Sequence, residues 1–269
     1  MVVGASEARA VTRTVRLETS GALAVVELAH AAKFNAMTRS MWCQLREVFH
    51  QIQQDTALRC VVVHGKQHFC AGGDISEYPS FRFQEDSLRA FHEEEVWGGL
   101  QAMLDCDLPL IARISGNCMG AGVEIASCCD IRIAAQDARF GAPIAKLGFP
   151  MAPREAALVA RAVGELTARE MLLAAAVLDA TAMQQRGFLN RVVAQADLDA
   201  AVQACVEHIV PLAPQAARMN KQTFRAIARV FIDNDATNLV ANAYRYANSD
   251  EHREGIAAFA EKRAPRFSA

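Results

Sequence analysis

The sequence lacks the features of three common classes of protein. No uninterrupted apolar run approaches the ~20 residues of a membrane-spanning helix. The formal net charge of −2 leaves no basic field to attract the phosphate backbone of a nucleic acid. Residues 1–10 contain no apolar segment of a secretory signal, so we expect a short cytoplasmic tail there. We therefore expect a cytoplasmic globular protein whose main partner is neither a membrane nor a nucleic acid.

The cysteines form no metal-binding or disulfide pattern. The chain has eight, none in a Cys-x-x-Cys pair and none spaced with the seven histidines as metal ligands would be. Most lie in apolar runs, such as the one that begins at Cys60, which favours free buried thiols in a reducing compartment. Cys70 and Cys118 stay open as nucleophiles, with little to support that role. The sequence predicts no metal and no nicotinamide or flavin cofactor.

The hydrophobic pattern alternates between strands and helices over the first two thirds of the chain. Two β-rich runs, 15–18 and 23–28, flank a turn and predict a hairpin. Thr38 is placed as the N-cap of a helix whose apolar residues recur at helical spacing over 41–52. Further strands are predicted at 60–63, 110–114, 131–134 and 191–193, with a helical segment over 84–105. Such alternation predicts an α/β core with a largely parallel sheet.

Strand signals stop near Asp197. The remaining chain predicts helices at 197–210, 215–230, 236–247 and 250–262, separated by prolines and a polar turn. We therefore expect an α/β core over residues 1–196 and a helical C-terminal region over residues 197–269.

Two of the predicted strands lead into turns of small residues. Strand 60–63 is followed by Phe-Cys-Ala-Gly-Gly-Asp-Ile at 69–75, and strand 110–114 by Ser-Gly-Asn-Cys-Met-Gly-Ala-Gly-Val-Glu at 115–124. Small residues let a ligand approach the main chain, and ligands of parallel sheets bind beyond the carboxyl ends of strands. The second turn opens a helix, whose first N–H groups lack intrahelical acceptors. One N–H from each turn, converging on one point, would form an oxyanion hole.

Other interpretations of these turns stay open. Gly120 and Gly122 either shape a ligand site or merely allow close packing of helix and strand. A dinucleotide-binding fingerprint is disfavoured, because its third small position falls on Ile125 and no acidic residue ends a second strand about 20 residues on. Glu124 is either a carboxylate that complements the helix N-terminus or a general acid/base whose pKa burial raises.

At these residues the chain resembles the enoyl-CoA hydratase/isomerase (crotonase) superfamily. The similarity runs through nearly the whole chain, in motifs at 33–37, 69–75, 120–124, 139–143 and 253–263. It implies an α/β, crotonase-like (ClpP/crotonase) spiral of ββα units, with a helical C-terminal region at 197–269 that mediates assembly into homotrimers, usually paired into hexamers. It also implies an acyl-CoA thioester as substrate, so that CoA enters as part of the substrate and no separate cofactor is needed.

The resemblance also implies roles for particular residues. The amides of Ala71 and Ala121 would form the oxyanion hole, and Glu124 matches the first of two glutamates that handle water in the hydratases. The position of the second glutamate is Ile144, whose side chain cannot transfer a proton. The substrate contacts implied by the resemblance are Lys33, Phe34, Ala71, Gly72, Gly73, Asp74, Ala121, Ile144 and Lys262.

The reaction and the acyl group stay open. A hydratase-like reaction with Glu124 as the acid/base is the leading hypothesis. A double-bond shift, a decarboxylation or a thioester hydrolysis needs only one carboxylate, which Ile144 favours, and a non-catalytic acyl-CoA binder is a further alternative. Glu155, at a predicted helix start, is either structural or a substitute for the second glutamate. The aromatic residues of segment 75–100 either line the acyl pocket as a lid or belong to the core.

Several further residues also have two interpretations. Asp74 is expected to be structural, Glu77 to face the loop surface, and His68 to be a loop side chain rather than a catalytic base. Lys262 and Arg263 either contact CoA phosphates across a subunit boundary or form a solvated basic end to the last helix.

Overall fold

The computed structural model describes residues 13–229 and 244–266 of the chain. Its first half contains β1 (Thr14–Ser20), β2 (Leu23–Ala29), α1 (Arg39–Gln54), β3 (Cys60–His64), α2 (Glu85–Ala90), α3 (Trp97–Asp105), β4 (Leu110–Ile114), β5 (Asn117–Met119), α4 (Ala121–Ser127) and β6 (Ile131–Ala135). Its second half contains β7 (Arg139–Gly141), α5 (Pro153–Val163), α6 (Glu165–Leu173), β8 (Val177–Asp179), α7 (Ala180–Gln185), β9 (Arg191–Val193), α8 (Leu198–Ile209), α9 (Pro214–Arg229) and α11 (Asp250–Ala260). The predicted N-terminal tail lies outside the described residues.

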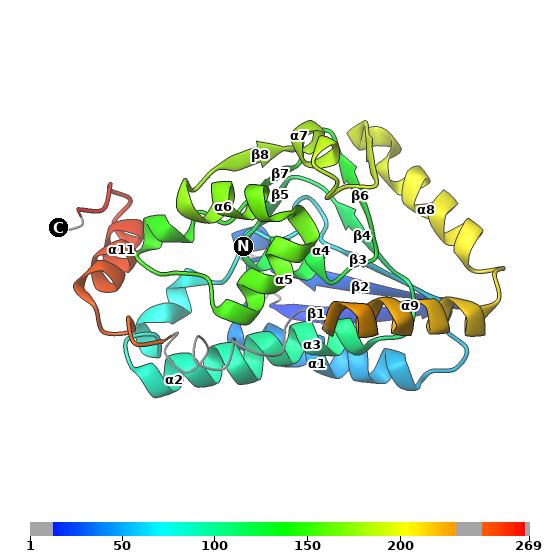
Figure 1. The fold of residues 1–269 in the computed structure, drawn as a ribbon, viewed down its shortest axis with the longest axis horizontal. Coiled ribbons are helices and arrows are strands. Elements are labelled where there is room, and N and C mark those ends of the chain that lie inside the picture. Colours follow the sequence, from blue (N-terminus) through cyan, green and yellow to red (C-terminus); the bar gives the residue numbers. More distant parts are fainter. Residues whose placement is uncertain (1–12, 230–243, 267–269) are drawn as a thin grey trace, which may run out of the picture.

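The strands form one large and one small sheet (Figure 1). In the large sheet the order is β1-β2-β3-β4-β6-β9, and only the β1–β2 hairpin is antiparallel. The predicted hairpin and largely parallel sheet are therefore confirmed. The small sheet, β5-β7-β8, was not predicted, because each of its strands has only three residues and produces no periodic pattern.

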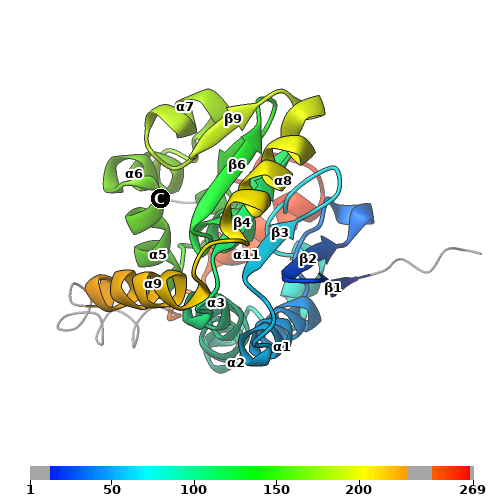
Figure 2. The ribbon, with the colours of Figure 1, turned by 90° about the vertical axis from the view of Figure 1, so that its right-hand side faces the viewer.

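Helices cover both faces of the large sheet. Alternate residues of β3 point to opposite faces, so Val61 and Val63 join the core cluster that contains α1, α3 and α4, while Cys60 and Val62 join a second cluster under α8. Figure 2 shows α8 crossing the sheet in front of β3, β4 and β6. The predicted N-cap is confirmed, because Thr38 Oγ1 accepts the N–H of Met41 at 3.2 Å.

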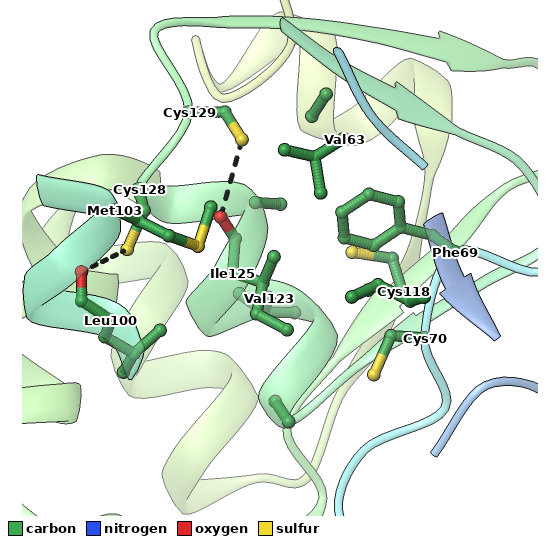
Figure 3. Packing of buried hydrophobic residues seen from close by; sticks show 14 of the residues in the cluster. Val63, Phe69, Cys70, Leu100, Met103, Cys118, Val123, Ile125, Cys128 and Cys129 are labelled. Atoms are coloured by element: carbon green, nitrogen blue, oxygen red, sulfur yellow. Dashed lines mark hydrogen bonds between the residues drawn. The ribbon is translucent and has the colours of Figure 1, made fainter. Parts of the chain in front are cut away.

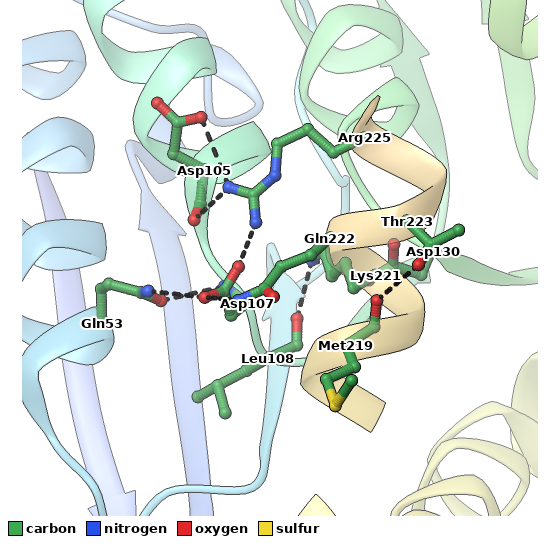
Figure 4. A network of polar contacts seen from close by, with 10 residues as sticks. All are labelled: Gln53, Asp105, Asp107, Leu108, Asp130, Met219, Lys221, Gln222, Thr223 and Arg225. Atoms are coloured by element: carbon green, nitrogen blue, oxygen red, sulfur yellow. Dashed lines mark hydrogen bonds and ion pairs between the residues drawn. The ribbon is translucent and has the colours of Figure 1, made fainter. Parts of the chain in front are cut away.

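Helices α8, α9 and α11 confirm the predicted helical character of the C-terminal region. The predicted helix at 236–247 lies largely outside the described residues, and 244–247 form a turn. Polar contacts fix α9 to the loops after α3 and α4: Arg225 pairs with Asp107, and Lys221 with Asp130 at 2.9 Å (Figure 4). No helix in the two described ranges has the length and apolar character needed to cross a bilayer.

Helix α11 docks on the 3-10 helix Ile144–Leu147 through two glycines. A Cβ atom on Gly255 would lie 2.2 Å from the carbonyl carbon of Leu147, and one on Gly148 would lie 2.0 Å from the carbonyl oxygen of Glu251. Backbone therefore packs directly on backbone here. This contact fixes the segment that begins at Ile144, the position of the missing second glutamate.

Replacing Gly255 with alanine tests this contact. We expect Gly255→Ala to lower the unfolding temperature, because overpacking against backbone costs roughly 1–3 kcal/mol. Gly98→Ala in α3 is the matched control, since its Cβ would meet only the end of the Arg46 side chain. Alanine favours a helix by about 1 kcal/mol over glycine, so the control should be as stable as the wild type or more so. Equal unfolding temperatures for both variants in thermal denaturation would contradict the docking contact.

Candidate active site

The two turns of small residues lie against each other at one edge of the molecule's core. Cys70 pairs in parallel with Cys118, which brings the start of the first turn beside β5 (Figure 3). A Cβ atom on Gly122 would lie 2.5 Å from the carbonyl oxygen of Cys70, so no larger residue fits at that position. A Cβ atom on Gly120 would lie 3.7 Å from the Cα atom of Gly72. The predicted meeting of the two turns is therefore present.

The N–H group of Ala71, the predicted oxyanion donor, already has a hydrogen-bond acceptor within the protein. Its N–H donates to the carbonyl oxygen of Phe34 at 3.0 Å. Phe34 reaches it because both Phe34 and Asn35 adopt left-handed backbone conformations, with φ of 51° and 62°. An amide with an internal acceptor has no hydrogen left for a substrate oxygen. The prediction of Ala71 as a donor is therefore wrong for this structure.

Several other amides on these turns, among them those of Gly73 and Ala121, have no acceptor among the residues that the structure describes. Ala121 is the first residue of α4, so its N–H lacks an intrahelical acceptor. Met37 hydrogen-bonds to the carbonyl of Gly72 and to the N–H of Asp74, both at 2.8 Å. In this parallel pairing the N–H of the residue between them, Gly73, points away from Met37. Gly73 and Ala121 thus present one free amide from each turn.

Glu124 is buried within α4, all of whose residues are buried. Its carboxyl group has no hydrogen-bond partner in the described parts of the chain. Burial and, second, the negative charge of Glu155 raise the pKa of Glu124 to about 8, although the positive charge of Arg82 acts the other way. The group therefore holds a proton near neutral pH and can give it up to a reacting group.

Glu155 lies in the first turn of α5, as its predicted helix start requires, but it is not on the surface. Its side chain is only 3% exposed. Its Oε1 accepts a hydrogen bond from Nδ1 of His92 at 2.9 Å. Burial lowers the pKa of His92, so the ring is neutral and its proton sits on Nδ1 when it donates to an ionised Glu155.

The aromatic segment 75–100 packs around a buried arginine. The guanidinium of Arg82 lies 4.3 Å from the ring centre of Tyr78 and 4.0 Å from that of Phe149, and it donates to the hydroxyl of Tyr246 at 3.1 Å. Tyr78, Phe81 and Phe91 are buried in the core cluster. Of the two interpretations of this segment, the core role thus holds for these three aromatic residues.

The contacts of Lys33 and Asp74 are made within the protein. The Nζ of Lys33 lies 2.6 Å from Oδ1 of Asp74, which also accepts the N–H of Ser76 and so caps the 3-10 helix Ile75–Ser80. Burial acts to raise the pKa of Asp74, but the hydrogen bonds from Lys33 and Ser76 outweigh it and the pKa is lowered. Asp74 is structural, as expected.

His68 and Glu77 are also engaged in local structure. Nδ1 of His68 accepts the N–H of Asn117 at 3.0 Å, which ties the first turn to β5. Glu77 accepts the N–H of Arg39 at 2.8 Å, at the start of α1. These contacts favour the expected structural role of His68, and the half-buried Glu77 makes its contact with α1 at the surface, which is compatible with the expected surface position.

Ile144 borders an apolar groove of about 480 Å³. Most of its lining is apolar, from Phe149, Met151, Leu172, Leu173 and Tyr246, while Ser249 and Glu251 add polar groups. The apolar part of the lining suits an alkyl group.

The basic C-terminal residues differ in their contacts. Arg263 pairs with Glu254 at 2.6 Å, so a phosphate would have to compete for it. Lys262 is exposed and has no ion pair within the described residues.

The cysteines are free thiols, and the two that the sequence left open as nucleophiles are buried. All eight are unbonded, and Cys70 and Cys118 pack beside Phe69 (Figure 3). Burial raises the pKa of Cys70 to about 12. Because the thiolate is the reactive form, Cys70 is not a nucleophile.

The raised pKa of Glu124 predicts how the free energy of unfolding changes with pH. The folded protein binds a proton between the ordinary pKa of 4.5 and about 8, so the stability of the wild type falls as the pH rises through this window. Glu124→Gln cannot ionise. Its unfolding free energy relative to the wild type should rise by at least about 1 kcal/mol from about pH 5 to about pH 8.5, measured by denaturant unfolding. A difference that stays constant with pH would show that Glu124 has no raised pKa.

Comparisons with known proteins agree with the site and the fold. Residues 18–269 match the enoyl-CoA hydratase/isomerase family. A probable enoyl-CoA hydratase of Mycobacterium leprae is 30% identical over 259 residues, which cover 95% of this chain and 98% of the relative. The short-chain-enoyl-CoA hydratase of Clostridium acetobutylicum is 29% identical, covering 93% and 95%.

Solved structures give the same result. An enoyl-CoA hydratase/carnithine racemase from Magnetospirillum magneticum has a TM-score of 0.78 at 33% identity, with 95% of each chain covered. A methylmalonyl-CoA decarboxylase in complex with 2-nitronate-propionyl-CoA has a TM-score of 0.85 at 23% identity, covering 95% and 98%, which supports the fold alone. The predicted crotonase-like α/β fold is confirmed, and the chain belongs to the enoyl-CoA hydratase/isomerase family.

Proposed function

We propose that this chain is an acyl-CoA-processing enzyme that hydrates enoyl-CoA substrates. The amides of Gly73 and Ala121 hold the thioester oxygen, and Glu124 transfers the proton. The observation that carries this proposal is the presence of one free amide on each of two touching turns, with a protonated, buried carboxyl group one helical turn from the second amide. Such donors matter most where charge develops in the transition state, and the loss of one typically costs about 3–4 kcal/mol.

Local electrostatics favour a negative oxygen at this point. The N–H of Ala121 belongs to the N-terminus of α4, where the helix dipole adds partial positive charge. Electron density that moves onto the thioester oxygen is therefore stabilised, and the α-carbon becomes basic enough to take a proton. Glu124, which holds a proton up to a pKa of about 8, supplies it.

The names of the relatives favour hydration among the reactions that an enolate permits. The proteins from Mycobacterium leprae and Clostridium acetobutylicum are both named enoyl-CoA hydratases. The specific alternative is a double-bond shift, in which Glu124 moves one proton between two carbons. Ile144 favours it, because that side chain supplies no second carboxylate.

We also propose how the CoA part of the substrate is bound and how the chains assemble. CoA enters as part of the substrate without a separate cofactor, and the exposed side chain of Lys262 contacts its phosphates in this proposal. The apolar side chains of Met219, Phe224 and Ile227 are exposed on α9, which supports burial in a homotrimer or a hexamer. We further propose that the protein acts in the cytoplasm.

Removal of the Glu124 carboxyl group should abolish the chemistry but not substrate binding. We expect Glu124→Gln to lower kcat on crotonyl-CoA by about 100-fold or more with little change in KM. Mass spectrometry of the wild-type product separates the two reactions, since hydration adds one water and a double-bond shift adds nothing. The matched control is Glu165→Gln, which alters an exposed glutamate on α6. Undiminished turnover by Glu124→Gln would exclude the proposed role.

Removal of the Ala121 N–H should weaken the oxyanion hole alone. Proline is tolerated at the first position of a helix but has no N–H. We expect Ala121→Pro to lower kcat by about 100-fold or more, while Ala121→Gly, which keeps the N–H, retains activity. Circular dichroism checks that α4 persists. If the proline variant turns over crotonyl-CoA like the glycine variant, this amide is not a catalytic donor.

A further inference from the structure

The site contains a second buried carboxylate, although it is not at the position of Ile144. Glu155 is 2% exposed, and its negative charge is the strongest neighbouring influence on Glu124. The two glutamates come from helices α4 and α5, about 30 residues apart in sequence but packed together in the fold. The structure therefore brings together two carboxyl groups that sequence spacing does not connect.

A purely structural role does not account for the burial of Glu155. A glutamate in the first turn of a helix complements the helix dipole equally well from the surface. Here the side chain is turned inward, away from water, and its negative charge acts on the carboxyl group of Glu124. Burying two like charges together is unfavourable unless they share protons or meet opposite charge. The positive charge of Arg82, itself 1% exposed, offsets one of them, and the proton on Glu124 neutralises the other.

His92 holds Glu155 in a defined position. It lies in the π-helical turn Phe91–Val96 between α2 and α3, and such turns redirect side chains and often occur at functional sites. The ring donates to Glu155 at 2.9 Å and stacks on Tyr244, with ring centres 5.6 Å apart and planes at 21°. Its other nitrogen, Nε2, is buried and has no hydrogen-bond partner among the residues that the structure describes. The ring is thus fixed by stacking, and the hydrogen bond that it makes within this part of the chain goes to Glu155.

We propose that Glu155 is the second catalytic carboxylate of this enzyme, and that His92 is the residue that positions it. Glu155 does the work that the side chain of Ile144 cannot. This inference rests on the proposed hydration reaction and names the group that activates water.

The two carboxyl groups account for every proton in the reaction. The oxygen of water forms a bond to the β-carbon of the enoyl group, while one proton of water passes to ionised Glu155. The electron pair of the carbon–carbon double bond moves onto the thioester oxygen, held by Gly73 and Ala121. As that pair returns, Glu124 gives its proton to the α-carbon, which completes a 3-hydroxyacyl-CoA. Transfer of one proton from Glu155 to Glu124 then restores the starting state.

The test separates water activation from enolate formation. We measure hydration of crotonyl-CoA, and separately the exchange of the α-hydrogens of butyryl-CoA with deuterated water by NMR, which needs only Glu124 and the two amides. Glu155→Gln should lower kcat for hydration by about 100-fold or more while α-hydrogen exchange continues. Hydration by Glu155→Gln at the wild-type rate would overturn the inference and leave the role of Glu124 standing. A wild type that exchanges but does not hydrate would also overturn it, and one that does neither would refute the proposed function as well.

Variants of His92 test its positioning role, and this test remains valid even if the Glu155→Gln variant does not fold. Asparagine has an N–H close to the place of Nδ1, whereas leucine has none. We expect His92→Leu to lower kcat for hydration with KM nearly unchanged, and His92→Asn to restore much of the loss. Both variants should keep α-hydrogen exchange. Equal hydration by His92→Leu and the wild type, or equal loss in His92→Asn and His92→Leu, would contradict the positioning role.

Discussion

The whole site depends on one contact, the approach of α4 to the carbonyl of Cys70 at Gly122. A Cβ atom there would be 2.5 Å from that oxygen, so only glycine allows the first turn to lie against the N-terminus of α4. The contact brings Gly72 of the first turn near Gly120 of the second, and it also sets where Glu124 enters the core. The relative positions of the free amides and of Glu124 thus depend on Gly122, a residue that takes no part in the proposed reaction. Close backbone packing, rather than a polar network, assembles the centre.

Electrostatic balance is the second constraint on the site. Glu124, Glu155 and Arg82 are all buried, and no hydrogen bond joins any two of these three side chains in the described residues. Their charges are balanced only if the two carboxyl groups hold one proton between them. The aromatic rings of Tyr78 and Phe149 stabilise the guanidinium without neutralising it. The centre is therefore a low-dielectric environment in which Glu124 holds a proton near neutral pH, as acid/base chemistry requires.

The sequence predicted what periodicity and composition determine, and it missed what depends on conformation at single residues. The hairpin, the parallel sheet and the Thr38 N-cap follow from local patterns. The occupied amide of Ala71 does not, because it depends on left-handed conformations at Phe34 and Asn35, more than 30 residues away. The short strands β5, β7 and β8 produce no period. The contact of Glu155 with His92 spans 63 residues, so no sequence motif marks it.

With Glu155 as the proposed second carboxylate, an enzyme of this family could lack the motif glutamate at position 144 and still activate water. Activation of water requires a carboxylate within reach of the β-carbon, and the reaction does not depend on the helix that provides it. The 3-10 helix that begins at Ile144 is held by α11, where Gly255 packs on Leu147, and Ile144 itself packs against the apolar core, a setting that would disfavour a charged side chain. The first turn of α5, by contrast, tolerates negative charge because of the helix dipole, and His92 is close enough to orient it. A carboxylate is thus more easily stabilised at position 155 than at position 144 in this chain.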